Sequence, residues 1–160
     1  MPITADALET ALATFSAAAE KIIHAEGRVT PVAWLIPDAG APMLVVKPDD
    51  ATGAGWIEEP ARTLEPAAII WCGEYWIGAA SLPCQTAVRL PREDLPRPSE
   101  LPDRQEAIII RGVGRAADGD LIRAARASLI VRTVSDAHLK PFGAVPDEGR
   151  SEDFSAFLQA

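Results

Sequence analysis

The sequence predicts an α+β fold, in which a long N-terminal helix packs on a mainly antiparallel sheet of about five to six strands, with a short C-terminal helix. Two observations lead to this prediction. Apolar residues recur at helical spacing over about residues 4–26, and short β-rich runs separated by turn residues follow. With 160 residues the chain has the length of one ordinary domain, and we expect a single domain over 1–160.

The N-terminal helix is predicted from its ends and from its apolar stripe. Thr4 is a favourable N-cap, Asp6 lies in the first turn, where the helix dipole favours negative charge, and Gly27 follows the last turn. The stripe between them consists of Leu8, Leu12, Phe15, Ala19, Ile22 and Ile23. Alanines opposite the stripe leave a weakly polar second face, which could contact a partner helix.

Five apolar runs predict strands, at 32–36, 43–46, 67–77, 106–113 and 128–134. The loop between the first two runs contains Pro, Asp and Gly, which indicates a hairpin. The third run is apolar on both faces except at Glu74, so we expect a central strand with a bulge at Gly73. The last two runs predict a long antiparallel hairpin that turns at Asp118-Gly119.

The remaining segments are predicted to be connections, except at the C-terminus. Residues 48–66 are rich in Pro, Gly, Asp and Glu, and we expect an ordered excursion anchored by Trp56. Residues 91–104 contain four prolines and predict a crossing over the surface. The short C-terminal helix is expected after Ser151, with acids in its first turn.

Charge and composition exclude several classes of protein. The net charge of −8 opposes binding to nucleic acid or anionic lipid, unless basic residues gather on one face. The N-terminus lacks the pattern of a signal peptide, and no run approaches the ~20 apolar residues of a membrane span, so we expect a soluble, cytoplasmic protein. Cys72 and Cys84 form no zinc motif with the two histidines, so no metal or cofactor is expected, and reduced thiols are favoured over a disulfide.

One motif resembles a nucleotide-binding fingerprint. The run Gly112-Val113-Gly114-Arg115-Ala116-Ala117 has the form G-x-G-x-x-A after an apolar strand, and Asp136 closes the next strand. The residues that follow the motif, Asp118-Gly119-Asp120, fit a turn better than the helix that the fingerprint requires. A hairpin is therefore the preferred interpretation of this segment.

Basic residues gather in one part of the chain. Residues 104–132 hold three acids and six arginines, namely Arg104, Arg111, Arg115, Arg123, Arg126 and Arg132. If several of them share one face of the hairpin, that face could bind an anion or an acidic protein surface. The alternative is a solvated strand face whose arginines pair with acids elsewhere in the fold.

A second polar set could form a site with acid–base chemistry. Glu74 stands among Trp71, Tyr75 and Trp76, where a carboxyl group could have a raised pKa. The alternatives are that Glu74 faces solvent or pairs with an arginine. Three further polar residues, Asp103, Arg104 and Glu106, lie at the start of the next strand and could join Glu74. His24 follows Glu20 by one helical turn, which predicts a local ion pair, and His138 is expected in a loop.

Three short motifs together carry a resemblance. They are Glu74-Tyr75-Trp76, the run Pro98-Ser99-Glu100-Leu101-Pro102-Asp103-Arg104-Gln105-Glu106-Ala107, and Ile130-Val131-Arg132. The chain resembles a loose group of uncharacterised small proteins from bacteria and their phages, which share a Glu-aromatic strand and a Pro-Ser-x-x-Pro-x-Arg-x-Glu-Ala segment. Leu101 departs from the pattern, which has an acid there. The resemblance implies a strand pairing and a bacterial or phage origin, and it implies no activity.

Three hypotheses for the function follow. The first is a non-catalytic protein-binding or assembly module that contacts itself or another protein, because the sequence holds no metal set, nucleophile motif or phosphate loop. Exposed aromatic residues such as Trp76 would favour it. The second is a small-molecule-binding domain or enzyme, with its polar site around Glu74, Asp103, Arg104 and Glu106. The third is an acidic decoy that occupies a nucleic-acid-binding protein.

Overall fold

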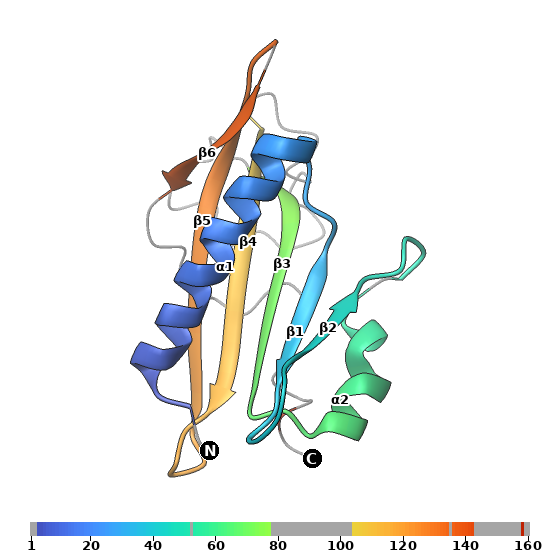
Figure 1. Ribbon diagram of the computed structural model, residues 1–160, viewed down its shortest axis with the longest axis vertical. Helices are drawn as coiled ribbons and strands as arrows, with labels where there is room; N and C mark the ends of the chain where they lie inside the picture. Colours follow the sequence, from blue (N-terminus) through green and yellow to red (C-terminus); the bar gives the residue numbers. More distant parts are fainter. Residues whose placement is uncertain (1–2, 52, 78–103, 135, 143–157, 159–160) are drawn as a thin grey trace, which may run out of the picture.

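A computed structural model describes residues 3–51, 53–77, 104–134, 136–142 and 158 of the chain (Figure 1). Its elements in chain order are α1 (Ala5–Glu26), β1 (Val32–Ile36), β2 (Met43–Val46), the 3-10 turn η1 (Gly55–Ile57), α2 (Glu58–Leu64), β3 (Ala68–Ile77), β4 (Gln105–Arg115), β5 (Leu121–Arg132) and β6 (Ala137–Phe142). The predicted α+β class is confirmed: α1 packs on an antiparallel sheet of six strands. None of the described helices is long and apolar enough to span a membrane.

The six strands follow one another across the sheet in the order β2-β1-β3-β4-β5-β6, so β2 and β6 form its edges. The long strands β3 and β4 pair without interruption from Ala68↔Gly114 to Ile77↔Gln105. The prediction of a bulge at Gly73 is wrong, because Gly73 pairs regularly with Ile109 in the β3–β4 ladder. Without a bulge, the side-chain alternation of β3 continues to its end, which places Glu74 on the face that α1 covers.

Each face of the sheet carries its own apolar cluster, as the alternation of strand side chains requires. The cluster under α1 comprises Leu8, Leu12, Ala19, Ile23, Val29, Ile70, Cys72, Ile108, Ile110, Ile130 and Ala137. The cluster on the opposite face comprises Ala33, Leu35, Ile57, Ala61, Ile69, Trp71, Val113 and Leu158. Because η1 and α2 supply Ile57 and Ala61 to this second cluster, the described chain has three layers.

Helix α1 begins and ends as its sequence predicts. The Thr4 hydroxyl accepts a hydrogen bond from the Ala7 N–H at 3.2 Å, which satisfies one of the free donors of the first turn. At the other end Gly27 adopts a left-handed conformation with φ of 74°, and its N–H donates to the Ile23 carbonyl at 2.8 Å. The buried residues Leu8 and Leu12 lie against β4 at Gly112, where a side chain would not fit.

Several elements differ from the sequence-based expectation. The second helix, α2, lies in the middle of the chain, in the stretch predicted to be an excursion anchored by Trp56. The helix predicted after Ser151 lies outside the described residues, apart from the buried Leu158. Strand β5 begins earlier than predicted, at Leu121, and β6 was not predicted, so His138 lies in an edge strand and not in a loop.

Candidate functional site

Three of the predicted polar residues meet at the end of the sheet where α1 ends. Glu74, Glu106 and Arg132 stand on β3, β4 and β5, at positions whose side chains share the face under α1. The strand register explains why these side chains lie on one face. Glu74 pairs with Ile108 and Arg132 pairs with Ala137, and Ile108 and Ala137 belong to the cluster under α1. We call Glu74, Glu106 and Arg132 the polar cluster.

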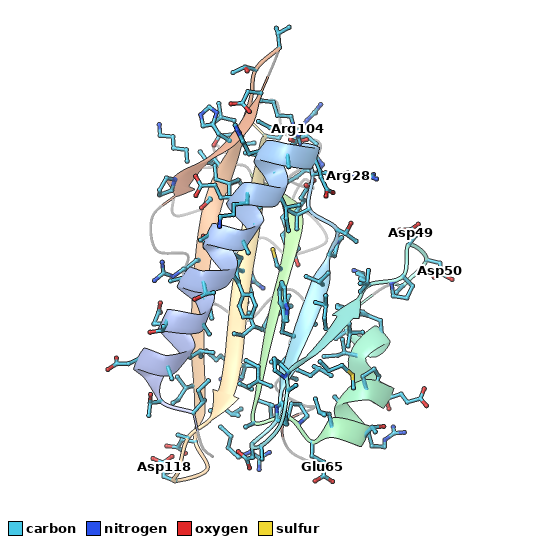
Figure 2. The ribbon with its side chains drawn as sticks, in the orientation of Figure 1. Arg28, Asp49, Asp50, Glu65, Arg104 and Asp118 are labelled. Carbon is cyan, nitrogen blue, oxygen red and sulfur yellow. The ribbon has the colours of Figure 1, made fainter. Side chains whose placement is uncertain are left out.

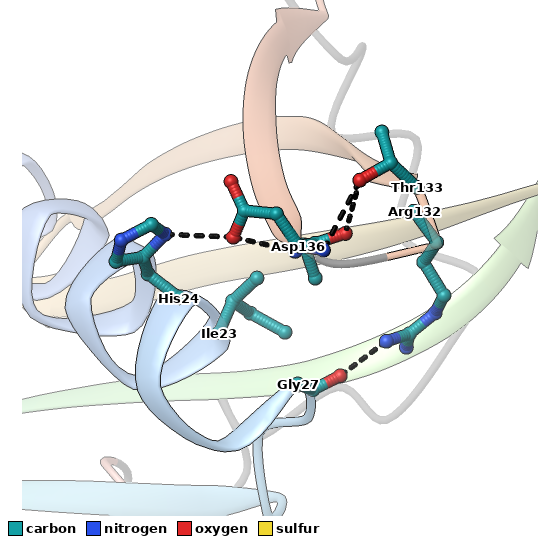
Figure 3. A pocket seen from close by; sticks show the side chains of 7 residues that line it. Ile23, His24, Gly27, Arg132, Thr133 and Asp136 are labelled. Carbon is teal, nitrogen blue, oxygen red and sulfur yellow. Dashed lines mark hydrogen bonds and ion pairs between the residues drawn. The ribbon is translucent and has the colours of Figure 1, made fainter.

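Through its guanidinium group, Arg132 connects its own strand β5 with β4, β3 and the end of α1. Its Nε donates to Glu106 Oε2 at 2.5 Å, and its Nη2 lies 4.0 Å from Glu74 Oε2. Its Nη1 donates to the Gly27 carbonyl at the end of α1 (Figure 3). Glu74 is held a second time, because its Oε1 accepts the Val29 N–H at 2.5 Å.

The polar cluster therefore works as a clamp on the C-terminus of α1. A helix C-terminus presents unpaired carbonyls and partial negative charge, so a cation there is favourable in both respects. The two carboxylates balance that cation, and each has about 30% of its side-chain surface exposed. Since Glu74 is engaged by both Val29 and Arg132, the geometry supports a structural role for it better than acid–base chemistry.

Of the other two members of the predicted polar site, Arg104 contacts Trp76, which pairs with Glu106 across the β3–β4 ladder, and Asp103 lies outside the described residues. The guanidinium carbon of Arg104 lies 5.3 Å from the ring centroid of Trp76, which is a cation–π arrangement at the end of β3. Trp76 keeps 44% of its surface exposed, whereas Trp71 is buried in the core.

The arginines of residues 104–132 do not share one face. Alternation along β4 and β5 places Arg111, Arg115 and Arg123 on the face opposite α1. Arg126 and Arg132 point to the α1 face, where Arg126 pairs with the exposed Glu9 at 3.3 Å and Arg132 with the polar cluster. Arg123 pairs with Val113, between Arg111 and Arg115, so three of the six arginines lie next to one another on the face opposite α1.

A depression of about 270 Å³ lies beside the end of α1 and was not foreseen (Figure 3). Its walls include His24, Thr133 and Asp136. His24 Nδ1 lies 3.0 Å from Asp136 Oδ1, so His24 contacts a residue far along the chain rather than the Glu20 that the sequence predicted. Asp136 Oδ1 also accepts the Ala137 N–H at 2.8 Å, and its backbone is tied to Thr133, so these groups close the turn before β6.

The segment that resembles a nucleotide fingerprint is part of a hairpin. Gly112, Gly114 and Arg115 belong to β4, and the turn closes through hydrogen bonds from the Gly119 N–H to the Ala116 carbonyl and from the Ala116 N–H to the Asp120 carbonyl. No helix follows the glycines, so nothing there presents backbone N–H groups to a pyrophosphate. Among the described residues no group of three metal-ligating side chains occurs either.

Cys72 is a free, buried cysteine under α1, and Cys84 lies outside the described residues. Burial raises the pKa of the Cys72 thiol from 9.0 to about 12, and the negative charge of Glu74 adds to the shift. The protonated thiol behaves as a small apolar side chain. It is a poor nucleophile, because the thiolate is the reactive form.

The Cys72 shift predicts how stability depends on pH. Between pH 9 and about pH 12 the unfolded thiol is ionised while the folded one stays protonated. The free energy of unfolding therefore falls as pH rises through that window, by up to about 1.4 kcal/mol per pH unit from this group. Urea titrations under reducing conditions measure it: from pH 9 upward the wild-type protein should lose stability more steeply than Cys72→Ala, and parallel curves would contradict the shift.

The edge strand β2 is the most exposed apolar element of the described chain. Met43, Leu44 and Val46 expose 38%, 53% and 54% of their surface. Edge strands are commonly protected by charges, prolines or bulges within the strand, and none of these occurs in Met43–Val46. Figure 1 shows α1 over β4 and β5, with β1 and β2 beside it rather than beneath it.

Among the residues that the structure describes, no strand pairs with the backbone of β2 on its outer side. The Lys47 N–H donates to the Pro31 carbonyl at 2.9 Å, so the N–H groups of Met43 and Val45, which have the same parity as Lys47, point toward β1. The N–H and C=O groups of Leu44 and Val46 then point away from the sheet. We call the outward backbone groups and exposed side chains of Met43–Val46 the β2 edge.

No protein-family model, curated protein or solved structure matches the chain.

Proposed function

We propose that the protein is a non-catalytic protein-binding module, and that it binds through the β2 edge. The observation that carries the proposal is the combination of exposed Leu44 and Val46 side chains with outward backbone donors and acceptors on the same two residues. A strand from another chain can satisfy these groups by continuing the sheet, while its side chains cover the apolar ones. The backbone bonds contribute affinity and the side chains contribute specificity.

The neighbourhood of the β2 edge supports the same interpretation. On the α1 face, Phe15 and Trp34 stack with ring centroids 4.1 Å apart, and Ile22 of α1 is 40% exposed. Trp34 pairs with Leu44 across the β1–β2 ladder, so the aromatic stack borders the β2 edge. An apolar area that runs from Phe15 through Trp34 to Leu44 is typical of protein-binding surfaces.

The alternatives find less support in the geometry. A small-molecule site around Glu74, Arg104 and Glu106 would need polar groups that are available to a ligand, whereas Glu74 and Glu106 are bound to Arg132 and Val29. An acidic decoy would need acids along one continuous face. Figure 2 shows Asp49 and Asp50 together in the loop after β2, and Glu58 forms an ion pair with Arg62 on α2.

The proposal is tested by photo-crosslinking in cells of the source organism. A benzoylphenylalanine at position 43 should give discrete protein adducts, because this exposed side chain belongs to the β2 edge. The same probe at the exposed Asp118, in the turn between β4 and β5, serves as the control position. Equal adduct patterns at both positions would contradict the proposal.

A paired variant tests whether the apolar side chains are needed. Leu44→Lys with Val46→Lys should abolish the adducts from position 43, since two buried charges would oppose any strand placed against the edge. The fold should persist, because both side chains are more than half exposed in the free protein. We expect the free energy of unfolding to change by about 0.5 kcal/mol or less, as measured by urea titration. Persistent adducts from a folded double variant would count against the proposal.

A further inference from the structure

We infer that the β2 edge binds a second copy of this chain, with the two β2 strands antiparallel and a twofold axis at Val45. This inference rests on the proposed function, and it names the partner. The resulting dimer would contain one continuous sheet in which the two β2 strands lie side by side.

The backbone of β2 is complementary to itself in one register. Within β2, only Leu44 and Val46 point their backbone N–H and C=O groups away from the sheet. Hydrogen bonds across the twofold axis can therefore form only between these residues of the two copies. When Leu44 of one copy faces Val46 of the other, both pairs lie within the strand and exchange four hydrogen bonds. Val45 then faces its own counterpart as a non-hydrogen-bonded pair.

Two prolines limit the pairing to these residues. Pro42 and Pro48 have the same parity as Leu44 and Val46, so a residue at either position would direct its backbone N–H away from the sheet. Proline has no such N–H to donate. In the register centred on Val45 they face each other, and neither can extend the ladder as a donor. Shifting the register by two residues would instead set Leu44 or Val46 against a proline that lies outside β2.

Side chains and charges also fit a second copy in this register. Leu44 and Val46, both more than half exposed, would cover Val46 and Leu44 of the other copy on the α1 face. β2 itself carries no charge, and the first charged residue after it, Lys47, would face Met43 of the other copy. The acids Asp49 and Asp50 lie beyond the paired residues, in the loop after β2 (Figure 2).

The small contact area sets the expected strength. Stable interfaces bury roughly 800 Å² on each partner, which four backbone residues and three partly exposed side chains do not supply. Each copy also carries a net charge of −8, so the copies repel each other at low salt. We therefore expect a weak dimer, with a Kd on the order of 100 μM, that strengthens as salt screens the repulsion.

Disulfide trapping tests the register directly. A non-hydrogen-bonded pair holds its Cα atoms about 4.5 Å apart, within the range that a disulfide spans. Val45→Cys, in a Cys84→Ser background that leaves only the buried Cys72 thiol besides, should form a covalent dimer under mild oxidation. Ala41→Cys is the matched control, because its counterpart would lie about 27 Å away along the paired strands. Val45→Cys should give roughly tenfold more dimer.

A second trapping experiment, with a peptide in place of the second copy, distinguishes this inference from the proposed function. A peptide of residues 42–48 with cysteine at position 45 presents the same strand without the rest of the second copy, and a scrambled peptide is its control. Trapping of the whole protein as a dimer supports the inference. Trapping of the peptide but not of the protein would overturn the second copy as partner and leave the open edge in place. If neither is trapped above its control, both the inference and strand addition at the β2 edge fail.

Discussion

Replacing Arg132 with methionine should lower the free energy of unfolding by about 2 kcal/mol. The change keeps much of the apolar stem but leaves Glu74 and Glu106 without their shared cation, and it frees the Gly27 carbonyl at the end of α1. Breaking a fully buried ion pair costs about 3–5 kcal/mol, and the partial exposure of these carboxylates reduces that cost. Urea denaturation followed by circular dichroism measures it.

Arg126→Met is the matched control for this prediction. Arg126 lies on the same strand and the same face, but its partner Glu9 is about half exposed and lies 3.3 Å away. An exposed ion pair contributes about 0.5 kcal/mol or less, so the control should stay close to wild type. Glu106→Gln added to Arg132→Met should restore part of the stability, since it removes one uncompensated charge. Equal losses for the two arginine variants would refute the clamp on α1.

Gly112→Ala should destabilise the protein by about 1–3 kcal/mol, because it overpacks the contact between β4 and α1. An added Cβ would lie 2.7 Å from Leu12 Cδ1 and 2.8 Å from Leu8 Cδ1, and both leucines are fully buried. They can yield only by pushing α1 away from the sheet or by leaving their preferred rotamers. The midpoint of urea denaturation reports the loss.

Gly55→Ala provides the control for the glycine substitution. An added Cβ at Gly55 would meet no atom within 4 Å, and the residue does not adopt a left-handed conformation. We expect a change of about 0.5 kcal/mol or less, in either direction. If Gly112→Ala is as mild as this control, α1 is not packed on Gly112 as closely as described.

The fold could be predicted where local signals and packing agree. Helix α1 has a cap at each end and an apolar stripe, and β3 is an apolar run long enough to be a central strand. Strand β6 escaped prediction because it is an edge strand with His138, Lys140 and Pro141 in it, so its pattern resembles that of a loop. Helix α2 escaped because it has only seven residues and includes a proline, although a proline is tolerated in a first turn.

The polar cluster could be predicted only in part. The sequence singled out Glu74 and Glu106 by their position in apolar strands, and an arginine was one of the partners considered for Glu74. Which arginine it is depends on the register of three strands and on where α1 ends, and neither is encoded by local spacing. The pair of His24 with Asp136 is equally long-range, so the nearer Glu20 was the natural choice from sequence.

The exposure of β2 is a property of topology rather than of local pattern. The run 43–46 reads as an ordinary apolar strand, and only the strand order places it at an edge with Leu44 and Val46 uncovered. Had β2 been flanked on both sides, the same residues would simply have been core. This is why sequence reasoning could propose a protein-binding module without singling out β2.

Amide hydrogen exchange at β2, followed by NMR in dilute and concentrated protein, tests the open edge most directly. In dilute protein the amides of Leu44 and Val46 should exchange fast while those of Met43 and Val45, which point toward β1, are protected. In concentrated protein the protection of Leu44 and Val46 should rise. Equal protection of all four amides in dilute protein would contradict an open edge, and fast exchange of Leu44 and Val46 at every concentration would contradict self-pairing.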